Sequence, residues 1–266
     1  MAQEKWLVDG PKVIDLENID RLKVGLVGGH IDIVAHDEPG ARVEVHSVTG
    51  RELLIQVDGD RLEIDHPQLR WDNWIEAFKS FGQSMKAEVS VLVPRHVAVT
   101  LGVVSAEALV VGVEADVQLN TVSGDIVADG LTGKLTVNSV SGEITIRDHA
   151  GVVGVNTISG DLIASGAITK LDADGVSSEI MLDASGIPDA VRVNTVSGAV
   201  TARFEPDTPA SYTVQTVGGK LQLDAQSITG VKGRYTARHG DLDKHWTDVR
   251  VNTVGGDISI LHTVRS

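Results

Sequence analysis

The sequence contains no cysteine, so neither a disulfide nor a thiolate metal site is available. No apolar stretch approaches the roughly 20 residues of a membrane-spanning helix, and we expect no membrane insertion. The start, Met1–Trp6, lacks a basic region followed by an apolar run, so no signal peptide is predicted and a cytoplasmic location is expected.

Positive charge is also scarce: the chain has 23 Lys and Arg residues and 37 Asp and Glu residues, which give a formal net charge of −14. Nucleic acids and anionic lipid surfaces are bound by clusters of basic residues, which release counterions. The sequence therefore predicts neither as a partner. Aromatic residues make up only 3%, whereas 42% of the chain is hydrophobic. These values favour a narrow core of stacked aliphatic side chains.

What the chain does contain is a repeat. The motif NTVSGDI at Asn120–Ile126 returns as NSVSGEI, NTISGDL, NTVSGAV, QTVGGKL and NTVGGDI. Glycines recur at half the period, nine residues apart, and then again in the later copies, where Ser178 takes one position. We interpret them as structural turn glycines, which allow positive φ or close approach of the next coil: Gly124, Gly133, Gly142, Gly151, Gly160, Gly198, Gly219 and Gly256.

Aliphatic residues follow the same nine-residue spacing, in pairs two residues apart, which is typical of short strands with one buried face. Two strands and two turns in each period predict an all-β fold, a parallel β-solenoid (β-helix) with coils of about 18–21 residues.

We expect a single domain over residues 1–266. Residues 1–65 form irregular N-terminal coils, including Val27–Ile31 and Val48–Glu52, and residues 89–266 form the regular repeat ladder, with longer loops after residue 200. A worn copy is expected at Arg238–Leu242, between the coils of Gly219 and Gly256.

Residues 66–88 interrupt the pattern with aromatic residues at helical spacing and predict a short helical insert. Its apolar residues are interpreted either as a cap on the open end of the core or as a docking element for a partner: Trp71, Trp74, Ile75, Phe78 and Phe81.

Three polar columns accompany the repeat. Carboxylates follow the glycine position at Glu107, Asp125, Glu143, Asp161, Glu179 and Asp257. Calcium is a candidate ligand for this column, but one acidic group per coil cannot supply the six to eight oxygens that the ion takes. We therefore expect these carboxylates to form a solvated edge. The asparagines at 120, 138, 156, 194 and 252 predict amide hydrogen bonds along the ladder, and the adjacent Thr and Ser residues are expected to bond in the same way.

Catalysis has little support in the sequence. The nine histidines show no ligand spacing, and the stretch from Val97 to Leu182 contains no aromatic residue for sugar subsites. The sequence therefore predicts no catalytic residue, no cofactor and no metal site.

The repeated motif, with its lead-in Val93–Val97, resembles the bacterial toastrack family of β-strand repeats, often labelled "putative adhesin". The resemblance implies a scaffold or sensor of the kind linked to cell-envelope stress, and no catalytic residues.

Our leading hypothesis is a non-enzymatic interaction scaffold with a protein partner, existing as a monomer or weak homo-oligomer. The alternative is a structural protein that polymerises end to end, as bactofilin-like solenoids do. A carbohydrate-active enzyme is the third interpretation.

Overall fold

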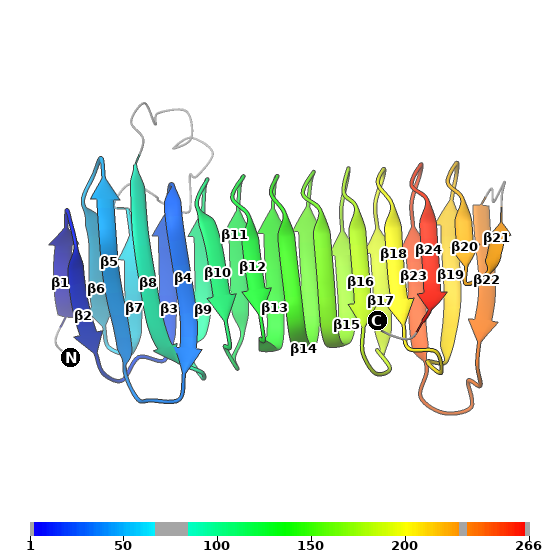
Figure 1. Cartoon of the computed structure of the whole chain (residues 1–266), viewed down its shortest axis with the longest axis horizontal. Coiled ribbons are helices and arrows are strands. Elements are labelled where there is room, and N and C mark those ends of the chain that lie inside the picture. Colours follow the sequence, from blue (N-terminus) through cyan, green and yellow to red (C-terminus); the bar gives the residue numbers. More distant parts are fainter. Residues whose placement is uncertain (1–2, 67–84, 229–232, 264–266) are drawn as a thin grey trace. The chain divides into compact units, whose positions relative to one another are not determined.

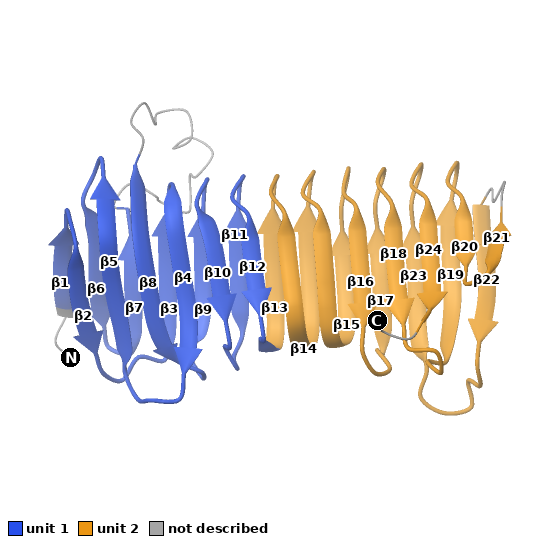
Figure 2. Ribbon diagram, viewed as in Figure 1, with its two compact units in different colours: residues 1–132 blue, residues 133–266 orange. Residues whose placement is uncertain are grey.

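The computed structural model describes residues 3–66, 85–228 and 233–263. Every regular element in these ranges is a β-strand, which confirms the all-β prediction (Figure 1). The chain divides into two compact units, residues 1–132 and 133–266 (Figure 2). The single domain expected from the sequence stays a prediction.

The strands of the first unit are β1 (Gln3–Val8), β2 (Lys12–Leu16), β3 (Arg21–Leu26), β4 (Gly29–His36), β5 (Ala41–Thr49), β6 (Leu53–Asp58), β7 (Arg61–Asp65), β8 (Lys86–Pro94), β9 (Ala98–Val103), β10 (Glu107–Val111), β11 (Val117–Thr121) and β12 (Ile126–Asp129).

The second unit begins within β13 (Thr132–Ser139) and continues with β14 (Ile144–Thr157), β15 (Leu162–Asp174), β16 (Ile180–Ala184), β17 (Ala190–Asn194), β18 (Val200–Phe204), β19 (Ala210–Thr216), β20 (Leu221–Leu223), β21 (Gln226–Ile228), β22 (Gly233–His239), β23 (Thr247–Asn252) and β24 (Ile258–His262).

Strand pairing in the first unit forms two ladders. One runs β1, β6, β7, β3, β9 and β11, and the other runs β2, β5, β8, β4, β10 and β12. From β7 to β11 in the first ladder, and from β8 to β12 in the second, every pair of neighbouring strands is parallel. β9 and β11 pair with Val99 opposite Val117, which is the predicted offset of one coil. The strand pairing of these coils thus has the period of the sequence repeat.

The N-terminal coils depart from the sequence prediction. β5 pairs antiparallel with β2 and β8, and β6 pairs antiparallel with β1 and β7. Val48–Glu52, predicted to belong to an irregular coil, therefore connects two strands that run antiparallel to their neighbours, and the prediction of parallel pairing was wrong here. Moreover, β3 and β4 lie between β7–β8 and β9–β10, although they precede both in the chain. The fold is solenoid-like, but its strands are mixed rather than all parallel.

The second unit keeps the coil-to-coil register first and then changes the order. β15 pairs with β14 and β16 at a shift of 18 residues, as Ile144 opposite Leu162 opposite Ile180 shows. β23 and β24 then pair on one side with β17 and β18 and on the other with β19 and β20. The last coil in the sequence, β23–β24, therefore lies between the β17–β18 coil and the β19–β20 coil.

This order corrects the expected worn copy at Arg238–Leu242. β22 pairs antiparallel with β19, and β21 pairs antiparallel with β20. The segment that carries Arg238 and His239 is therefore a reversed strand pair beside β19–β20 and not a coil between those of Gly219 and Gly256.

The core consists of alternate aliphatic side chains from most strands, whereas β21 and β22 contribute no buried side chain. In β15, Leu162 and Ala164 are buried while Ile163 between them is exposed. Full burial of one Val, Leu or Ile side chain contributes about 1.5–3 kcal/mol, so a column repeated in every coil stabilises the stack. Phe204 is the largest fully buried side chain.

Most of the predicted helical insert, residues 67–84, lies outside the described residues, and with it Trp71, Trp74, Ile75, Phe78 and Phe81. The predicted boundary at residue 88 was wrong, because Lys86–Glu88 already belong to β8. In the described part of the chain, no helix has the length and apolar character needed to cross a membrane.

Candidate functional site

The motif glycines stand where the backbones of successive coils come closest. A Cβ added at Gly160 would lie 2.1 Å from the carbonyl oxygen of Gly142, and one at Gly198 would lie 2.1 Å from that of Ser178. Similar approaches occur at Gly124, Gly219 and Gly256, while Gly133, Gly142 and Gly151 have positive φ. No side chain fits at these contacts unless the backbone moves.

The threonine before each glycine closes its own turn. Thr157 Oγ1 accepts a hydrogen bond from the N–H of Gly160 at 3.0 Å, and Thr121, Thr216 and Thr253 repeat the arrangement. For these four residues the expectation of bonds along the ladder was wrong, because a hydroxyl three residues before an orphan N–H is in reach locally. Thr195, in contrast, donates to the neighbouring coil, to the carbonyl oxygen of Val176 at 3.5 Å.

Asparagine amides, in contrast, bond between coils as predicted. Asn156 Nδ2 donates to Asn138 Oδ1 at 2.9 Å, and Asn252 Nδ2 donates to Asn194 Oδ1 at 2.7 Å. The carboxylate column has a similar role in the second unit. Asp161 accepts the N–H of Glu179 at 2.9 Å, and Asp257 accepts that of Lys220 at 2.8 Å. These carboxylates therefore tie one turn to the next.

The third residue of the motif forms a surface feature that the sequence did not single out. In the second unit five of these side chains are exposed, at 53% for Ile158, 46% for Val176, 50% for Val196, 52% for Val254 and 66% for Val217, while Val140 is half-buried. Backbone bonds set them in this order, since Ser177 N–H donates to Ile158, Val196 to Val176, Val254 to Val196 and Gly218 to Val254. We call this row of five side chains the valine ridge.

A shallow groove of about 520 Å³ lies beside the ridge. Val196, Val217 and Val254 line it together with polar side chains that include Asn194, Gln215 and Arg234. Its only carboxylate among the described residues is Asp174, which accepts a hydrogen bond from Asn194 at 2.7 Å. The groove therefore offers an apolar contact edge, but no acid and base pair.

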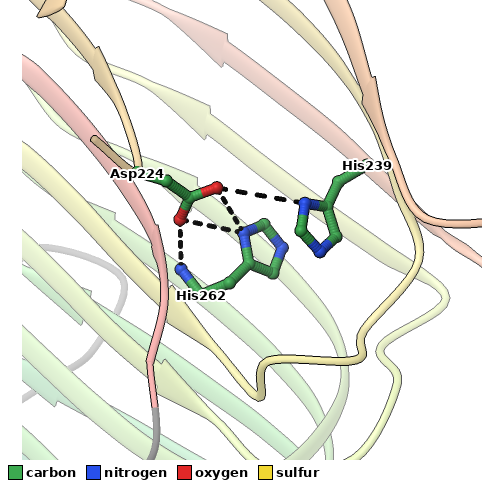
Figure 3. Close-up of side chains that lie close together, drawn as sticks. All are labelled: Asp224, His239 and His262. Atoms are coloured by element: carbon green, nitrogen blue, oxygen red, sulfur yellow. Dashed lines mark hydrogen bonds and ion pairs between the residues drawn. The ribbon is translucent and has the colours of Figure 1, made fainter. Parts of the chain in front are cut away.

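A second cluster joins Asp224, His239 and His262 in the same unit (Figure 3). Asp224 occupies the turn between β20 and β21 with φ of 48°, a conformation that Asp tolerates better than most residues. His262 ends β24 and His239 ends β22. The fold thus gathers residues from three segments, and no short-range spacing could have revealed them.

Hydrogen bonds fix the cluster on every side. Asp224 accepts from the backbone N–H of His262 at 2.6 Å and faces its Nδ1 at 3.1 Å. His262 Nε2 lies 2.8 Å from the hydroxyl of Tyr212, and the rings of His239 and His262 stack with their centroids 3.7 Å apart. Burial lowers the pKa of His262, against the opposing effect of Asp224, and burial raises the pKa of Tyr212.

The strand order and the repeated turn define the class of protein, a solenoid-like all-β repeat protein. The family model of Toastrack DUF4097 matches residues 19–261, so the chain belongs to this family. This confirms the resemblance noted from the motif.

One solved structure supports the fold, and two others are similar to the chain at lower TM-scores. A "putative lipid binding protein" of Parabacteroides distasonis shares 12% identity with a TM-score of 0.53, covering 96% of this chain and 97% of that one. A "putative cell adhesion protein" of Clostridium sporogenes shares 14% identity with a TM-score of 0.32 and coverage of 95% and 100%. A "putative adhesin" of Bacteroides fragilis shares 9% with a TM-score of 0.43 and coverage of 94% and 97%. No curated protein matches the chain.

Proposed function

We propose that the protein is a non-enzymatic interaction scaffold that binds a basic amphipathic helix of a protein partner along the valine ridge. The observation that carries the proposal is the exposure of five β-branched side chains in five successive layers of the second unit. Contiguous exposed apolar surface is typical of interaction sites, whereas single exposed apolar residues are common everywhere.

The spacing of the ridge selects a helix. Neighbouring strands lie about 4.8 Å apart, so five layers span roughly 19 Å. Side chains three and four residues apart on a helix advance by about 4.5 and 6 Å, close to the spacing of the layers. An extended strand presents side chains on one face only every 6.8 Å or so and falls out of register.

Charge and rigidity complete the description of the partner. Asp161, Glu179 and Asp257 are exposed on the same turns as the ridge, and the whole chain is acidic. A helix with Lys and Arg beside its apolar stripe therefore complements this edge, which increases the association rate and selects against acidic partners. The ridge is held by inter-coil backbone bonds and loses little freedom on binding.

Enzymatic function is less well supported. The groove beside the ridge has no pair of titratable groups for acid and base catalysis among its described lining residues. The alternative of end-to-end polymerisation predicts a different contact, through the end strands and not through the turns. It is therefore separable by experiment.

The test measures fluorescence anisotropy of a labelled helical peptide of about four turns, with Leu at every third or fourth position and Lys on both flanks. We expect the triple variant Val176→Ser, Val196→Ser and Val254→Ser to bind at least about tenfold more weakly, since 1.4 kcal/mol corresponds to one decade. Val13→Ser is the matched control, because Val13 is an equally exposed β-branched residue of the first unit.

Equal affinity of the ridge and control variants, or of a peptide with the Leu positions scrambled, would contradict the proposal. Neutral phospholipid vesicles serve as a second probe, prompted by the name of the Parabacteroides neighbour. Vesicle binding without peptide binding would replace the protein partner by a lipid. A mass that grows with concentration in light scattering, in wild type and ridge variant alike, would favour polymerisation.

A further inference from the structure

We infer that Asp224, His239 and His262 form a binding site for a divalent transition metal ion of the zinc type. Nδ1 of His262 and Nδ1 of His239 lie 3.1 Å and 3.9 Å from Asp224 Oδ2, and one ligand atom of each residue lies within 4.8 Å of the others. Ligands of one tetrahedral zinc ion, each about 2.1 Å from the metal, are about 3.4 Å apart. The observed separations fall on both sides of this value.

The outer hydrogen bonds favour coordination through Nδ1 of both rings. His239 Nε2 lies 3.1 Å from the carbonyl oxygen of Pro206, which can only accept, so Nε2 carries the proton and the Nδ1 lone pair of the neutral ring faces Asp224. A metal-binding histidine usually donates its second ring N–H in this way, to a carbonyl or a carboxylate.

His262 has a matching partner. Its Nε2 lies 2.8 Å from the Tyr212 hydroxyl, which can either donate or accept. Without metal, Nδ1–H donates to Asp224 and Nε2 accepts from Tyr212. With metal, the ring proton resides on Nε2 and donates to the Tyr212 oxygen, which frees Nδ1. The same hydroxyl thus serves both tautomers.

Metal binding requires one movement. The two rings stack at an interplanar angle of 6°, and an ion bound by both must lie near the plane of each. His262 is 4% exposed at its side chain and is fixed by its bonds, whereas His239 is 34% exposed and ends β22. We therefore expect His239 to turn out of the stack toward the ion.

The ligand set selects the metal. Two imidazoles and one carboxylate suit zinc and its neighbours, whereas calcium and magnesium require a shell of oxygens. Three protein ligands leave a fourth position for water or for a group of a bound molecule. The ion would also link β24, the β20–β21 turn and β22, three segments that are far apart in sequence.

Calorimetric titration of the full chain with Zn²⁺ at pH 7.5 tests the site, with Co²⁺ absorption as the readout of coordination. We expect one ion per chain, and an affinity at least about tenfold lower in His239→Ala and Asp224→Asn. For Tyr212→Phe we expect a loss of about ten- to a hundredfold, which is usual for outer partners of metal ligands. Affinity should fall as the pH is lowered, because protons compete with the metal for the ligand atoms.

His96→Ala is the matched control, because His96 forms an ion pair with a single carboxylate, Asp20 at 3.3 Å, and no second histidine of the described residues is paired with it. His239→Ala removes a half-buried ring at the end of β22 and leaves Asp224 and His262 in place, and its fold is checked by circular dichroism. Absence of Zn²⁺ binding, or equal affinity in His239→Ala and wild type, would overturn the site. Binding lost only in His96→Ala would do the same.

Discussion

In both units one segment lies out of sequence order in the stack of layers, an early segment in the first unit and a late segment in the second. In the first unit an early segment, β3–β4, lies between layers that follow it in the chain. In the second, the late segment β23–β24 lies between layers that precede it. Both units also contain antiparallel strands beyond the inserted layer. Coils with similar turns can therefore stack on one another in more than one order. The order of the layers in the stack differs from the order of the coils along the chain.

Two clusters of titratable groups, one in each unit, are held in different ways. In the first, Asp65 and His66 are adjacent, and Asp65 Oδ1 and His66 Nε2 are buried without a hydrogen-bond partner. Burial raises the pKa of Asp65 to about 7 and lowers that of His66 to about 4. In the second, Asp224, His239 and His262 bond to one another and to Tyr212. Burial disfavours the charged forms of Asp65 and His66, and also that of His149 in the second unit, whereas the cluster of Asp224, His239 and His262 is satisfied by contacts.

The largest effect is expected from deleting residues 247–266, which removes β23 and β24. β19 and β20 would lose the partners that connect them to β17 and β18, so the amides of β19, β20 and β22 should lose protection in hydrogen exchange. Deleting residues 1–16 is the comparison, because it removes β1 and β2, each of which pairs with one described strand only. Protection of β19 that survives the first deletion would show that β17 and β19 can pair directly.

A smaller effect is expected from Gly160→Ala, which places a Cβ 2.1 Å from the carbonyl oxygen of Gly142. We expect a loss of about 3 kcal/mol of stability in urea unfolding, because the backbones of two coils must separate. Gly154→Ala is the control in the same coil, since nothing lies within 4 Å of its added Cβ. It should raise stability by about 0.5 kcal/mol through the unfolded state. Equal losses in both variants would contradict the close-contact explanation.

The smallest effect is expected from Asp65→Asn, and it depends on pH. Below about pH 4 the carboxyl is protonated in both the folded and the unfolded state and adds no pH dependence. As pH rises to about 7 the unfolded state ionises first, so this group lowers the stability of the wild type over that range. The stability of the variant relative to wild type should therefore increase between pH 4 and pH 7 and stay constant above pH 7. Urea midpoints that differ equally at pH 4 and pH 8 would contradict it.

Local patterns were enough to predict the strands, the coil length and the turn. Apolar residues two apart require a strand with one buried face, and glycine recurs because the next backbone passes within the radius of a Cβ, as at Gly160. The asparagine ladder follows from the same period, because identical residues in adjacent layers lie within hydrogen-bond reach. Each of these features depends on neighbours that the repeat itself specifies.

Tertiary structure alone decided the order of the layers and the composition of the sites. A turn such as that of Gly256 presents the same N–H and C=O groups to either neighbour, so the motif cannot say whether Gly198 or Gly219 comes next, and both do. The direction of β5, β6 and β22 depends on connecting loops that carry no motif. Asp224, His239 and His262 meet only because that layer order brings the ends of β20, β22 and β24 together, which no spacing along the chain encodes.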